Sequence, residues 1–267
     1  MKDLSSIKII FIDIDGTLVN SRNHVSMKTK RSIKRVVNNG VYVVMTSGRN
    51  CMYCVDKSRK ALASKIVISS NGAEVYDYSL GSFISNDYIS HDIMKDIWQF
   101  CNDNDIGIVF NGFKGTYINK YLIGNNIYDS ELVTSLKELK SLNVSQFIMV
   151  SNDADKIFEA RDFVIKKGLV IGNYSNSFKN SSSYFYIDVV NSDINKGSGV
   201  SSLLNYLGID KEDSLCFGDF VNDIDMFDSC GFGVAMGNAH EDLKKKADFV
   251  TLSNDENGIA YFLDKYL

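Results

Sequence analysis

The chain has 267 residues, of which 45% are hydrophobic, and carries a formal net charge of -4 at pH 7. A chain of this length can bury a large core and is long enough for two domains. The small acidic charge and the lack of a long basic run exclude a typical nucleic-acid partner, which needs a basic face. No apolar stretch approaches the length of a membrane span, so we expect no membrane partner.

The N-terminal residues and the cysteines favour a cytoplasmic location. The apolar run from Ile7 to Ile14 is short and acidic, unlike a signal peptide. Five cysteines, an odd number in a chain this long, fit a reduced cytosolic protein better than a secreted one.

The first third of the chain alternates between predicted strands and predicted helices. Strands are predicted over 7–14, 41–46 and 66–69, with helices over 26–39 and 52–63 between them. Ser26 is a candidate N-cap of the first helix, and Gly40 lies just past its end. Because these strands are apolar throughout and separated by helices, they predict a parallel sheet covered on both faces.

The middle of the chain has a different pattern, which is typical of an α+β domain. Residues 90–104 carry Ile93, Ile97, Trp98 and Cys101 at helical spacing, and we interpret this stripe as core packing. Further elements are predicted as strands over 107–110, 116–119, 146–150 and 169–174, helices over 130–142 and 153–167, and a Ser/Asn-rich surface loop over 173–183. We therefore place an inserted α+β domain at residues 82–184.

The last third returns to the alternating pattern. Strands are predicted over 184–190, 214–217, 231–235 and 249–252, with helices over 197–207, 224–229 and 241–246 and at the C-terminus. Residues 1–81 and 185–267 are expected to form one Rossmann-like core, a parallel sheet with helices on both faces. The predicted fold class is therefore α/β, with the α+β domain inserted.

Polar side chains gather at the ends of three of these strands. Asp13 and Asp15 end the first strand, and Ser47 follows the second. Asp219 and Asp223 follow a strand in the last third. In open parallel sheets, ligands bind beyond the carboxyl ends of the strands. Clustered carboxylates repel one another unless positive charge lies among them, and Mg²⁺ with oxygen ligands is a natural neutraliser.

Other residues in these segments suit a phosphate group. Ser47 can donate a hydroxyl hydrogen, and Lys196 lies at the start of a helix, where backbone N–H groups add positive potential. Gly16, Gly48 and Gly218 allow the backbone to approach a ligand closely. With a metal present, one aspartate can attack phosphorus while the other exchanges protons.

These segments resemble the four motifs of the haloacid dehalogenase (HAD) superfamily. The matching residues are "DIDGTL" at 13–18, "TSGR" at 46–49, Lys196 and "GDFVND" at 218–223. Three further segments are similar to the Cof-type phosphatases, which carry a large α/β cap of the C2 type between the second and third motifs. They are "SSNGAEV" at 69–75, "VAMGNA" at 234–239 and "NDENGIA" at 254–260.

The resemblance implies a Mg²⁺-dependent phosphomonoester hydrolase that acts on small phosphorylated metabolites, such as sugar phosphates, through an aspartyl-phosphate intermediate. It implies that Asp13 is the nucleophile. Asp15 would be the general acid and base, and its backbone carbonyl would ligate the metal. Asp219 would be a metal ligand, with Asp223 close behind, directly or through water.

The same resemblance implies that Ser47, Lys196 and Asn222 hold the phosphate oxygens, and that the inserted cap covers the site and contributes the specificity surface. This chain departs from the family pattern at two positions. Phe220 stands where the family usually has a small or polar residue, which would narrow the site. Asn50 stands where the family often has proline. Neither change removes a chemical group that the mechanism needs.

In and after the second motif, the role of one arginine stays open, and a cysteine pair does not favour a zinc or redox site. Arg49 could touch the substrate or pair with an acid of the core. Cys51 and Cys54 form a C-x-x-C pair, but a zinc site would need a second pair. A thioredoxin-like site relies on a cis-proline, and this chain has no proline.

Three rival functions are compatible with the same motifs. A phosphomannomutase-like phosphomutase would return the phosphoryl group to the sugar, and free phosphate release separates it from a hydrolase. A sugar-phosphate sensor would bind without turnover. A transport ATPase has threonine where Asp15 stands and needs membrane helices. We expect a monomer or weak homodimer, and the specific substrate stays open.

Overall fold

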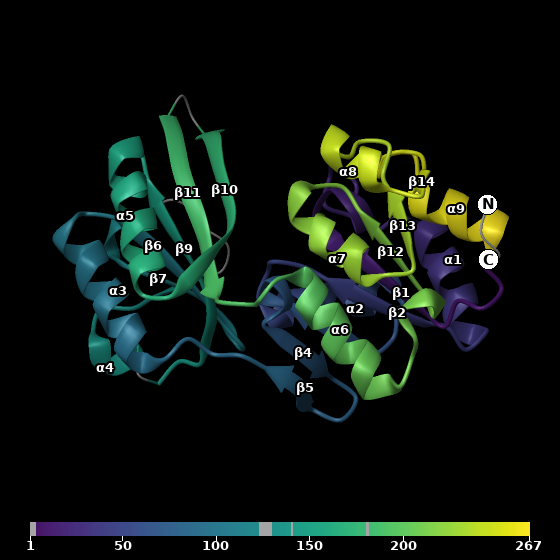
Figure 1. Ribbon diagram of the computed structural model, residues 1–267, viewed down its shortest axis with the longest axis horizontal. Coiled ribbons are helices and arrows are strands. Elements are labelled where there is room, and N and C mark those ends of the chain that lie inside the picture. Colours follow the sequence, from purple (N-terminus) through teal and green to yellow (C-terminus); the bar gives the residue numbers. More distant parts are fainter. Residues whose placement is uncertain (1–3, 123–129, 140, 180–181) are drawn as a thin grey trace. The chain divides into compact units, whose positions relative to one another are not determined.

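The structure, a computed structural model, describes residues 4–122, 130–139, 141–179 and 182–267. The chain divides into two compact units (Figure 1). Unit 1 comprises Met1–Arg49, Tyr53–Ser85 and Asn195–Leu267, and unit 2 comprises Asn50–Met52 and Asn86–Ile194. Each unit is built around its own sheet.

The sheet of unit 1 has the strand order β14-β13-β12-β1-β2-β3-β4-β5. Its strands are β1 (Ile9–Asp13), β2 (Tyr42–Thr46), β3 (Ile66–Ser69), β4 (Glu74–Asp77), β5 (Ser82–Asn86), β12 (Ser214–Gly218), β13 (Phe232–Ala235) and β14 (Phe249–Val250). Neighbours from β14 to β3 pair in parallel, and β4 pairs antiparallel with β3. Every residue of β1 and β12 is buried, so both faces of the sheet are covered. The predicted α/β class is confirmed.

The helices associated with this sheet include those predicted from the sequence. They are α1 (Met27–Asn38), α2 (Cys51–Ala61), α6 (Lys196–Leu207), α7 (Ile224–Ser229), α8 (Glu241–Lys246) and α9 (Gly258–Tyr266). The predicted N-cap is confirmed, because the Thr29 backbone N–H donates to Ser26 Oγ at 3.0 Å. Within unit 1, α1 packs against α9 and α6 packs against α7 (Figure 1).

The sheet of unit 2 has the order β10-β11-β9-β6-β7-β8. Its strands are β6 (Gly107–Gly112), β7 (Gly115–Ile118), β8 (Ser130–Leu132), β9 (Val144–Ser151), β10 (Leu169–Lys179) and β11 (Ser182–Asn191). Neighbours pair antiparallel except β7 and β8, which are parallel. The helices of this unit are α3 (His91–Asp103), α4 (Leu136–Leu139) and α5 (Ala154–Lys166).

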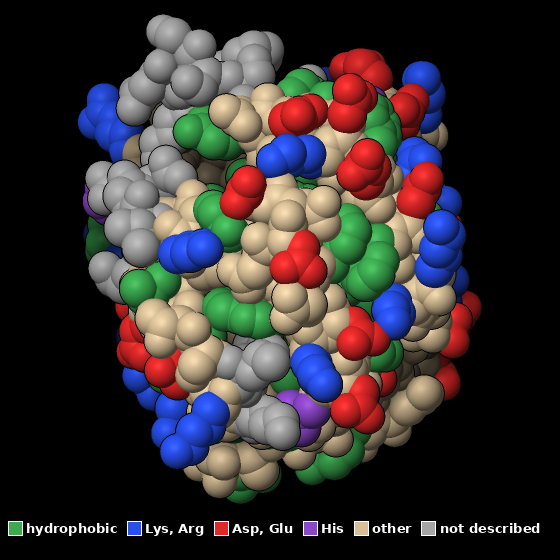
Figure 2. Space-filling view, turned by 90° about the vertical axis from the view of Figure 1, so that its left-hand side faces the viewer, with side chains coloured by type: hydrophobic (Ala, Val, Ile, Leu, Met, Phe, Trp, Pro, Cys, Tyr) green, Lys and Arg blue, Asp and Glu red, His purple; other side chains and the backbone are tan. Residues whose placement is uncertain are grey.

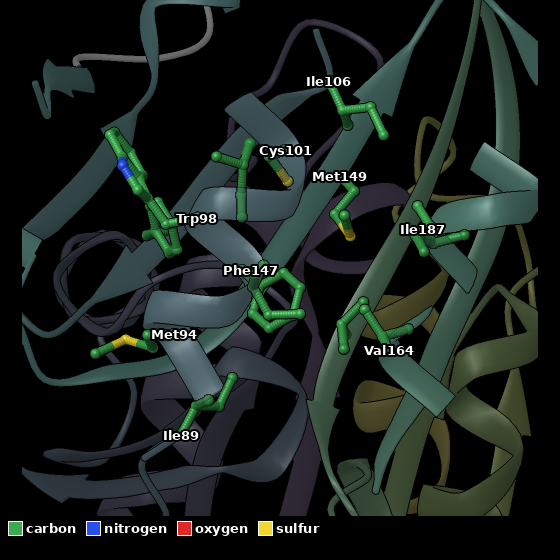
Figure 3. Packing of buried hydrophobic residues seen from close by; sticks show 14 of the residues in the cluster. Ile89, Met94, Trp98, Cys101, Ile106, Phe147, Met149, Val164 and Ile187 are labelled. Atoms are coloured by element: carbon green, nitrogen blue, oxygen red, sulfur yellow. The ribbon is translucent and has the colours of Figure 1, made fainter. Parts of the chain in front are cut away.

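The core of unit 2 lies between one face of this sheet and the helices α3 and α5. Met94 and Trp98 from α3 and Val164 from α5 join Phe147 and Met149 of β9 in one buried cluster (Figure 3). The Trp98 ring also stacks on a phenylalanine of β6, with centroids 6.1 Å apart. The interpretation of the Trp98 stripe as core packing is therefore confirmed.

The segment from 169 to 191 corrects two predictions. The surface loop expected over 173–183 is wrong for the described residues, because β10 and β11 form a long antiparallel pair there; residues 180–181 lie outside the described ranges. The strand expected over 184–190 does not join the core sheet, because it belongs to β11, which pairs with β9 in unit 2. Serine and asparagine usually mark loops, but pairing with a neighbouring strand outweighs that preference.

Two other segments also differ from the prediction. Residues 82–86, expected at the start of the insert, form β5 in the sheet of unit 1. The helix expected over 130–142 is wrong, because 130–132 form β8 and only Leu136–Leu139 are helical, while residue 140 lies outside the described ranges. The Thr134 backbone N–H donates to the Glu138 carboxylate at 2.8 Å, which ties the segment between β8 and α4 to the short helix.

The surface shows the balance expected from the small net charge. On the face drawn in Figure 2, acidic and basic side chains are interspersed. A helix with the length and apolar character of a membrane span does not occur among the described residues.

Candidate active site

The candidate active site of unit 1 lies at the carboxyl ends of β12, β1 and β2, three adjacent strands of the sheet. Asp13 is the last residue of β1, Asp219 follows β12, and Ser47 follows β2. Because these strands are parallel, their ends meet at the same edge. The structure therefore brings the predicted residues of three separate motifs to one edge of one sheet.

Three carboxylates form the centre of this site. Asp13, Asp219 and Asp223 each offer an oxygen, and these oxygens all lie within 4.8 Å of one another. Burial raises the pKa of Asp13 well above its ordinary value, and the charges of Asp223 and Asp219 raise it further, against the opposing effect of Lys196. Burial, followed by the charge of Asp223, raises the pKa of Asp219 to about 6. The cluster therefore carries more negative charge than its surroundings stabilise.

Lys196 is the cation inside this cluster. Its Nζ donates to Asp13 Oδ1 and to Asp223 Oδ1, both at 2.6 Å, and the residue is only 2% exposed. Burial lowers the pKa of this lysine, but the two carboxylates outweigh that effect and raise it above its ordinary value. Lys196 is the first residue of α6, where a capping box between Asn195 and Ser198 fixes the start of the helix.

Asp223 holds the other parts of the site in place. Its side chain is fully buried. One carboxylate oxygen accepts from Lys196, and the other accepts the backbone N–H groups of Asp219 at 2.9 Å and Phe220 at 3.1 Å. Both oxygens are thus engaged by the protein itself. Asp223 therefore orients Lys196 and the turn after β12.

The chain immediately after β1 contacts the turn after β12. Gly16 has a φ of 83°, and a Cβ at this position would lie 2.2 Å from Asp219 Oδ2, so only glycine fits there. The Thr17 hydroxyl donates to Asp219 Oδ1 at 2.8 Å. Thr17 belongs to the motif "DIDGTL" but was not among the residues predicted for the site. The available signal was a hydroxyl two residues after Asp15.

Asp15 points to a different partner from Asp13. Arg49 donates to it twice, from Nε to Oδ2 at 3.0 Å and from Nη2 to Oδ1 at 3.2 Å. The Arg49 guanidinium also lies over the Tyr53 ring, 5.5 Å from its centroid. Burial, with the nearby charge of Asp15, raises the pKa of Tyr53 to about 12. Of the two roles considered for Arg49, pairing with an acid is observed, with Asp15 as the partner. No sequence motif pointed to Tyr53.

The other predicted residues lie at the same edge. Asp13 of β1 lies opposite Thr46 of the neighbouring strand β2, so Ser47 lies one residue beyond that pair. Ser47 is buried, and its Oγ accepts the Arg49 backbone N–H at 3.2 Å. Asn222 is half-buried on the turn Val221–Asp223. That Ser47 and Asn222 hold a phosphate stays a prediction.

Phe220, the departure noted in the sequence, lies on the turn that follows β12. Its side chain is 42% exposed, and its ring meets the His240 ring edge-on, with centroids 6.0 Å apart. The nearby backbone is fixed by the His240 N–H, which donates to the Asp219 carbonyl at 2.8 Å. The aromatic side chain therefore stands partly in solvent beside the acidic cluster.

The donor set fits a hard divalent cation. Carboxylate oxygens are the ligands that Mg²⁺ prefers, and Mg²⁺ takes one or two of them with waters and phosphate oxygens. Asp13 and Asp219 share such oxygens at one place, and the raised pKa values of both show that added positive charge would stabilise their ionised forms. Because the cluster is rich in negative charge, it suits the binding of a phosphate only when a cation accompanies the phosphate.

Comparisons with known proteins agree with this geometry. A family model described as haloacid dehalogenase-like hydrolase matches residues 10–263. The 5-amino-6-(5-phospho-D-ribitylamino)uracil phosphatase YcsE of Bacillus subtilis is 28% identical over 257 residues, which cover 95% of this chain and 93% of that protein. Phosphatase YwpJ of the same organism is 30% identical over 289 residues, which cover 97% of this chain and 100% of that protein. A haloacid dehalogenase-like hydrolase from Bacteroides thetaiotaomicron shares the fold, with a TM-score of 0.80 at 24% identity over 98% of this chain and 100% of that one.

Proposed function

We propose that this chain, which belongs to the haloacid dehalogenase-like hydrolases and is a phosphatase, hydrolyses small phosphomonoesters with Mg²⁺ through a phosphoryl group carried on Asp13. The observation that carries the proposal is the buried cluster of Asp13, Asp219 and Asp223 around Lys196. Such a cluster costs stability in the free protein, so its presence at the strand ends favours a functional role.

The metal would be held by the carboxylates of Asp13 and Asp219 and by the backbone carbonyl of Asp15. Asp223 would stay behind them, since its two oxygens already accept from Lys196 and from backbone amides. When bound, Mg²⁺ would offset the charge of the cluster and of the phosphoryl oxygens.

In the first step, an Asp13 carboxylate oxygen attacks phosphorus while the bond from phosphorus to the ester oxygen breaks. The protonated Asp15 gives its proton to the departing oxygen, which leaves as an alcohol. Lys196, Ser47 and Asn222 donate hydrogen bonds to the phosphoryl oxygens and stabilise the charge that develops there.

In the second step, Asp15 takes a proton from a water molecule, and the water oxygen attacks the phosphorus of the aspartyl phosphate. The bond between phosphorus and the Asp13 oxygen breaks, so inorganic phosphate leaves and Asp13 is restored. Arg49 engages both oxygens of Asp15 in the free protein and would hold this carboxyl group in the orientation from which it exchanges protons.

The motifs and one relative support the proposed substrate class. YcsE is named for a substrate that carries a phosphate on a ribityl chain. This supports small phosphorylated metabolites, such as sugar phosphates or phosphorylated sugar alcohols, as the compounds to test. The five free cysteines support the expected cytoplasmic location.

The proposal is tested by phosphate release from a panel of sugar phosphates, sugar-alcohol phosphates and nucleoside monophosphates, with Mg²⁺ or with excess chelator. Rapid acid quenching followed by hydroxylamine trapping detects an acyl phosphate on the enzyme. The expected result is Mg²⁺-dependent phosphate release with a hydroxylamine-sensitive phosphoenzyme. Full activity in chelator would contradict the metal role, and phosphoryl return to the sugar without free phosphate would indicate a mutase.

A further inference from the structure

The turn that follows β3 has an unusual backbone. Ser70, Asn71 and Gly72 have φ values of 49°, 54° and 99°, three successive residues in the left-handed region. Glycine adopts this region freely and asparagine tolerates it, but serine rarely does. All three residues are buried at the carboxyl end of a strand next to β2. This turn belongs to the "SSNGAEV" segment, to which the mechanism above gives no role.

One side of the turn is bonded to the segment that carries Ser47. The Asn71 backbone N–H donates to the Ser47 carbonyl at 3.1 Å, and the Ser70 N–H donates to the Arg49 carbonyl at 2.9 Å. The two donors are successive residues of the left-handed turn, and both bond to the segment that follows β2. The turn thus fixes the backbone on both sides of Gly48.

The other side of the turn lies against the start of α6. A Cβ added to Gly72 would lie 2.0 Å from the Asn195 carbonyl oxygen, and one added to Gly199 would lie 2.8 Å from the Gly72 Cα. Asn195 is the N-cap residue directly before Lys196. The turn therefore touches the two segments that carry the proposed phosphate donors.

The Asn71 side chain fills the space above Gly48. A Cβ on Gly48 would lie 2.9 Å from the Asn71 Oδ1 and 3.1 Å from its Nδ2, so the carboxamide occupies the place that a larger residue would need. Asn71 is 5% exposed, and its Oδ1 finds no hydrogen-bond partner in the described part of the chain. A hydrogen bond to this oxygen therefore does not account for the position of the carboxamide, whereas its packing against Gly48 does.

We propose that Asn71 is a positioning residue of the phosphate site, whose carboxamide packs on Gly48 and holds the Ser47 hydroxyl in place. This inference rests on the proposed role of Ser47 as a phosphate donor. Asn71 acts through Ser47 and does not touch the substrate. Gly48 lacks a side chain because the Asn71 carboxamide takes its space.

A double-mutant cycle tests this packing. In Gly48→Ala, the new Cβ displaces the carboxamide, and in Asn71→Gly the carboxamide is lost while the left-handed turn remains allowed. We expect each variant to raise the inhibition constant of inorganic phosphate and the KM for 4-nitrophenyl phosphate about tenfold, since small misplacements of a positioning group are costly. In the double variant, the new Cβ occupies the space that the carboxamide has left. The double variant should therefore bind phosphate at least as well as Gly48→Ala alone.

A control variant separates a loss of phosphate binding from a general loss of stability. Asn257→Gly is the matched control, because Asn257 is also left-handed, with a φ of 63°, and its side chain forms no cap hydrogen bond. Asn71→Gly should melt within a few degrees of this control, yet only Asn71→Gly should lose phosphate affinity. An unchanged phosphate inhibition constant in Asn71→Gly, or fully multiplicative losses in the double variant, would overturn the inference.

The reference variant Ser47→Ala identifies which proposal has failed. If Ser47→Ala weakens phosphate binding while Asn71→Gly does not, the positioning role of Asn71 alone is wrong. If neither substitution changes phosphate binding, the role of Ser47 as a phosphate donor is wrong, and the role of Asn71 is lost with it.

Discussion

Arg49 holds both carboxylate oxygens of Asp15, at 3.0 Å from Nε and 3.2 Å from Nη2. This is the two-point geometry in which a guanidinium binds a carboxylate best, and a lysine cannot reproduce it. Asp15 lies only two residues from Asp13, yet its carboxylate is bound outside the buried cluster. The two carboxylates that begin the first motif are thus separated by having different cations as partners: Lys196 for Asp13 and Arg49 for Asp15.

Replacing Arg49 by lysine should therefore impair catalysis more than folding. The expected result is a fall in kcat/KM of about tenfold or more, because the orientation of Asp15 is lost. The melting temperature should change little, since the pair is partly exposed and such pairs contribute at most about 1 kcal/mol. Arg35→Lys is the matched control, because Arg35 pairs with Asp264 on the surface between α1 and α9. Equal kinetics in both variants would contradict the role of Arg49.

Asp13→Asn should abolish turnover without unfolding the protein. The raised pKa of Asp13 shows that its surroundings disfavour the charged carboxylate, so the neutral amide should melt at the same temperature as wild type or higher in chelator. Adding Mg²⁺ should stabilise the wild type more than the variant, because the variant lacks a ligand. Calorimetry with and without Mg²⁺, beside a phosphate-release assay, measures both effects. Retained turnover in this variant would rule out the covalent mechanism.

The raised pKa of Asp219 predicts a pH dependence of stability. An acid whose pKa rises from 3.8 to about 6 on folding binds protons more tightly in the native state. Its contribution to stability is therefore present at low pH and lost as the pH rises from about 4 to 6, by no more than about 3 kcal/mol. The free energy of unfolding, measured in chelator across this range, should fall less in Asp219→Asn than in wild type. Parallel curves for the two proteins would show that the pKa of Asp219 is not raised.

Unit 1 should fold without unit 2. We propose that the two units are separate domains, since each has its own sheet and unit 2 has its own buried cluster. Replacing residues 87–194 by a short flexible linker should leave a monomer with a cooperative melting transition. The Ser202 hydroxyl, which donates to Ser85 at 2.9 Å, ties β5 to α6 inside unit 1 and should be kept. Failure to fold with every linker length would count against these domain limits.

The sequence could predict the site better than the strand pairing, and the reason is physical. Asp13, Ser47 and Asp219 each end a run of apolar residues, and parallel packing forces the ends of such runs to one edge. Which sheet a strand joins depends on contacts far apart in the sequence, so residues 184–190 carried no local sign of their pairing with β9. Likewise, the position of Tyr53 under Arg49 depends on how α2 is oriented, and its residue type gave no indication of that.

Asp15→Asn should impair the two half-reactions unequally, depending on the leaving group. Asp15 is proposed first to protonate the departing alcohol and then to deprotonate the attacking water. A sugar alkoxide leaves poorly without a proton, so loss of the acid should slow the first step by about 10²–10⁴-fold. A nitrophenolate leaves readily without a proton, so that first step should be nearly spared, while the second step lacks its base with either substrate.

With 4-nitrophenyl phosphate, the Asp15→Asn phosphoenzyme should therefore accumulate and give one burst of nitrophenol per site, followed by a slow steady rate. With a sugar phosphate no burst should appear, because the first step is then slow as well. Rapid-mixing measurements on both substrates, with wild type alongside, distinguish the two patterns. Arg49→Lys is an informative companion, since it keeps the Asp15 carboxyl group and should give no burst of this kind. Equal losses on both esters without a burst would mean that Asp15 is not the shared acid and base, and that its pair with Arg49 serves only to hold the turn after β1.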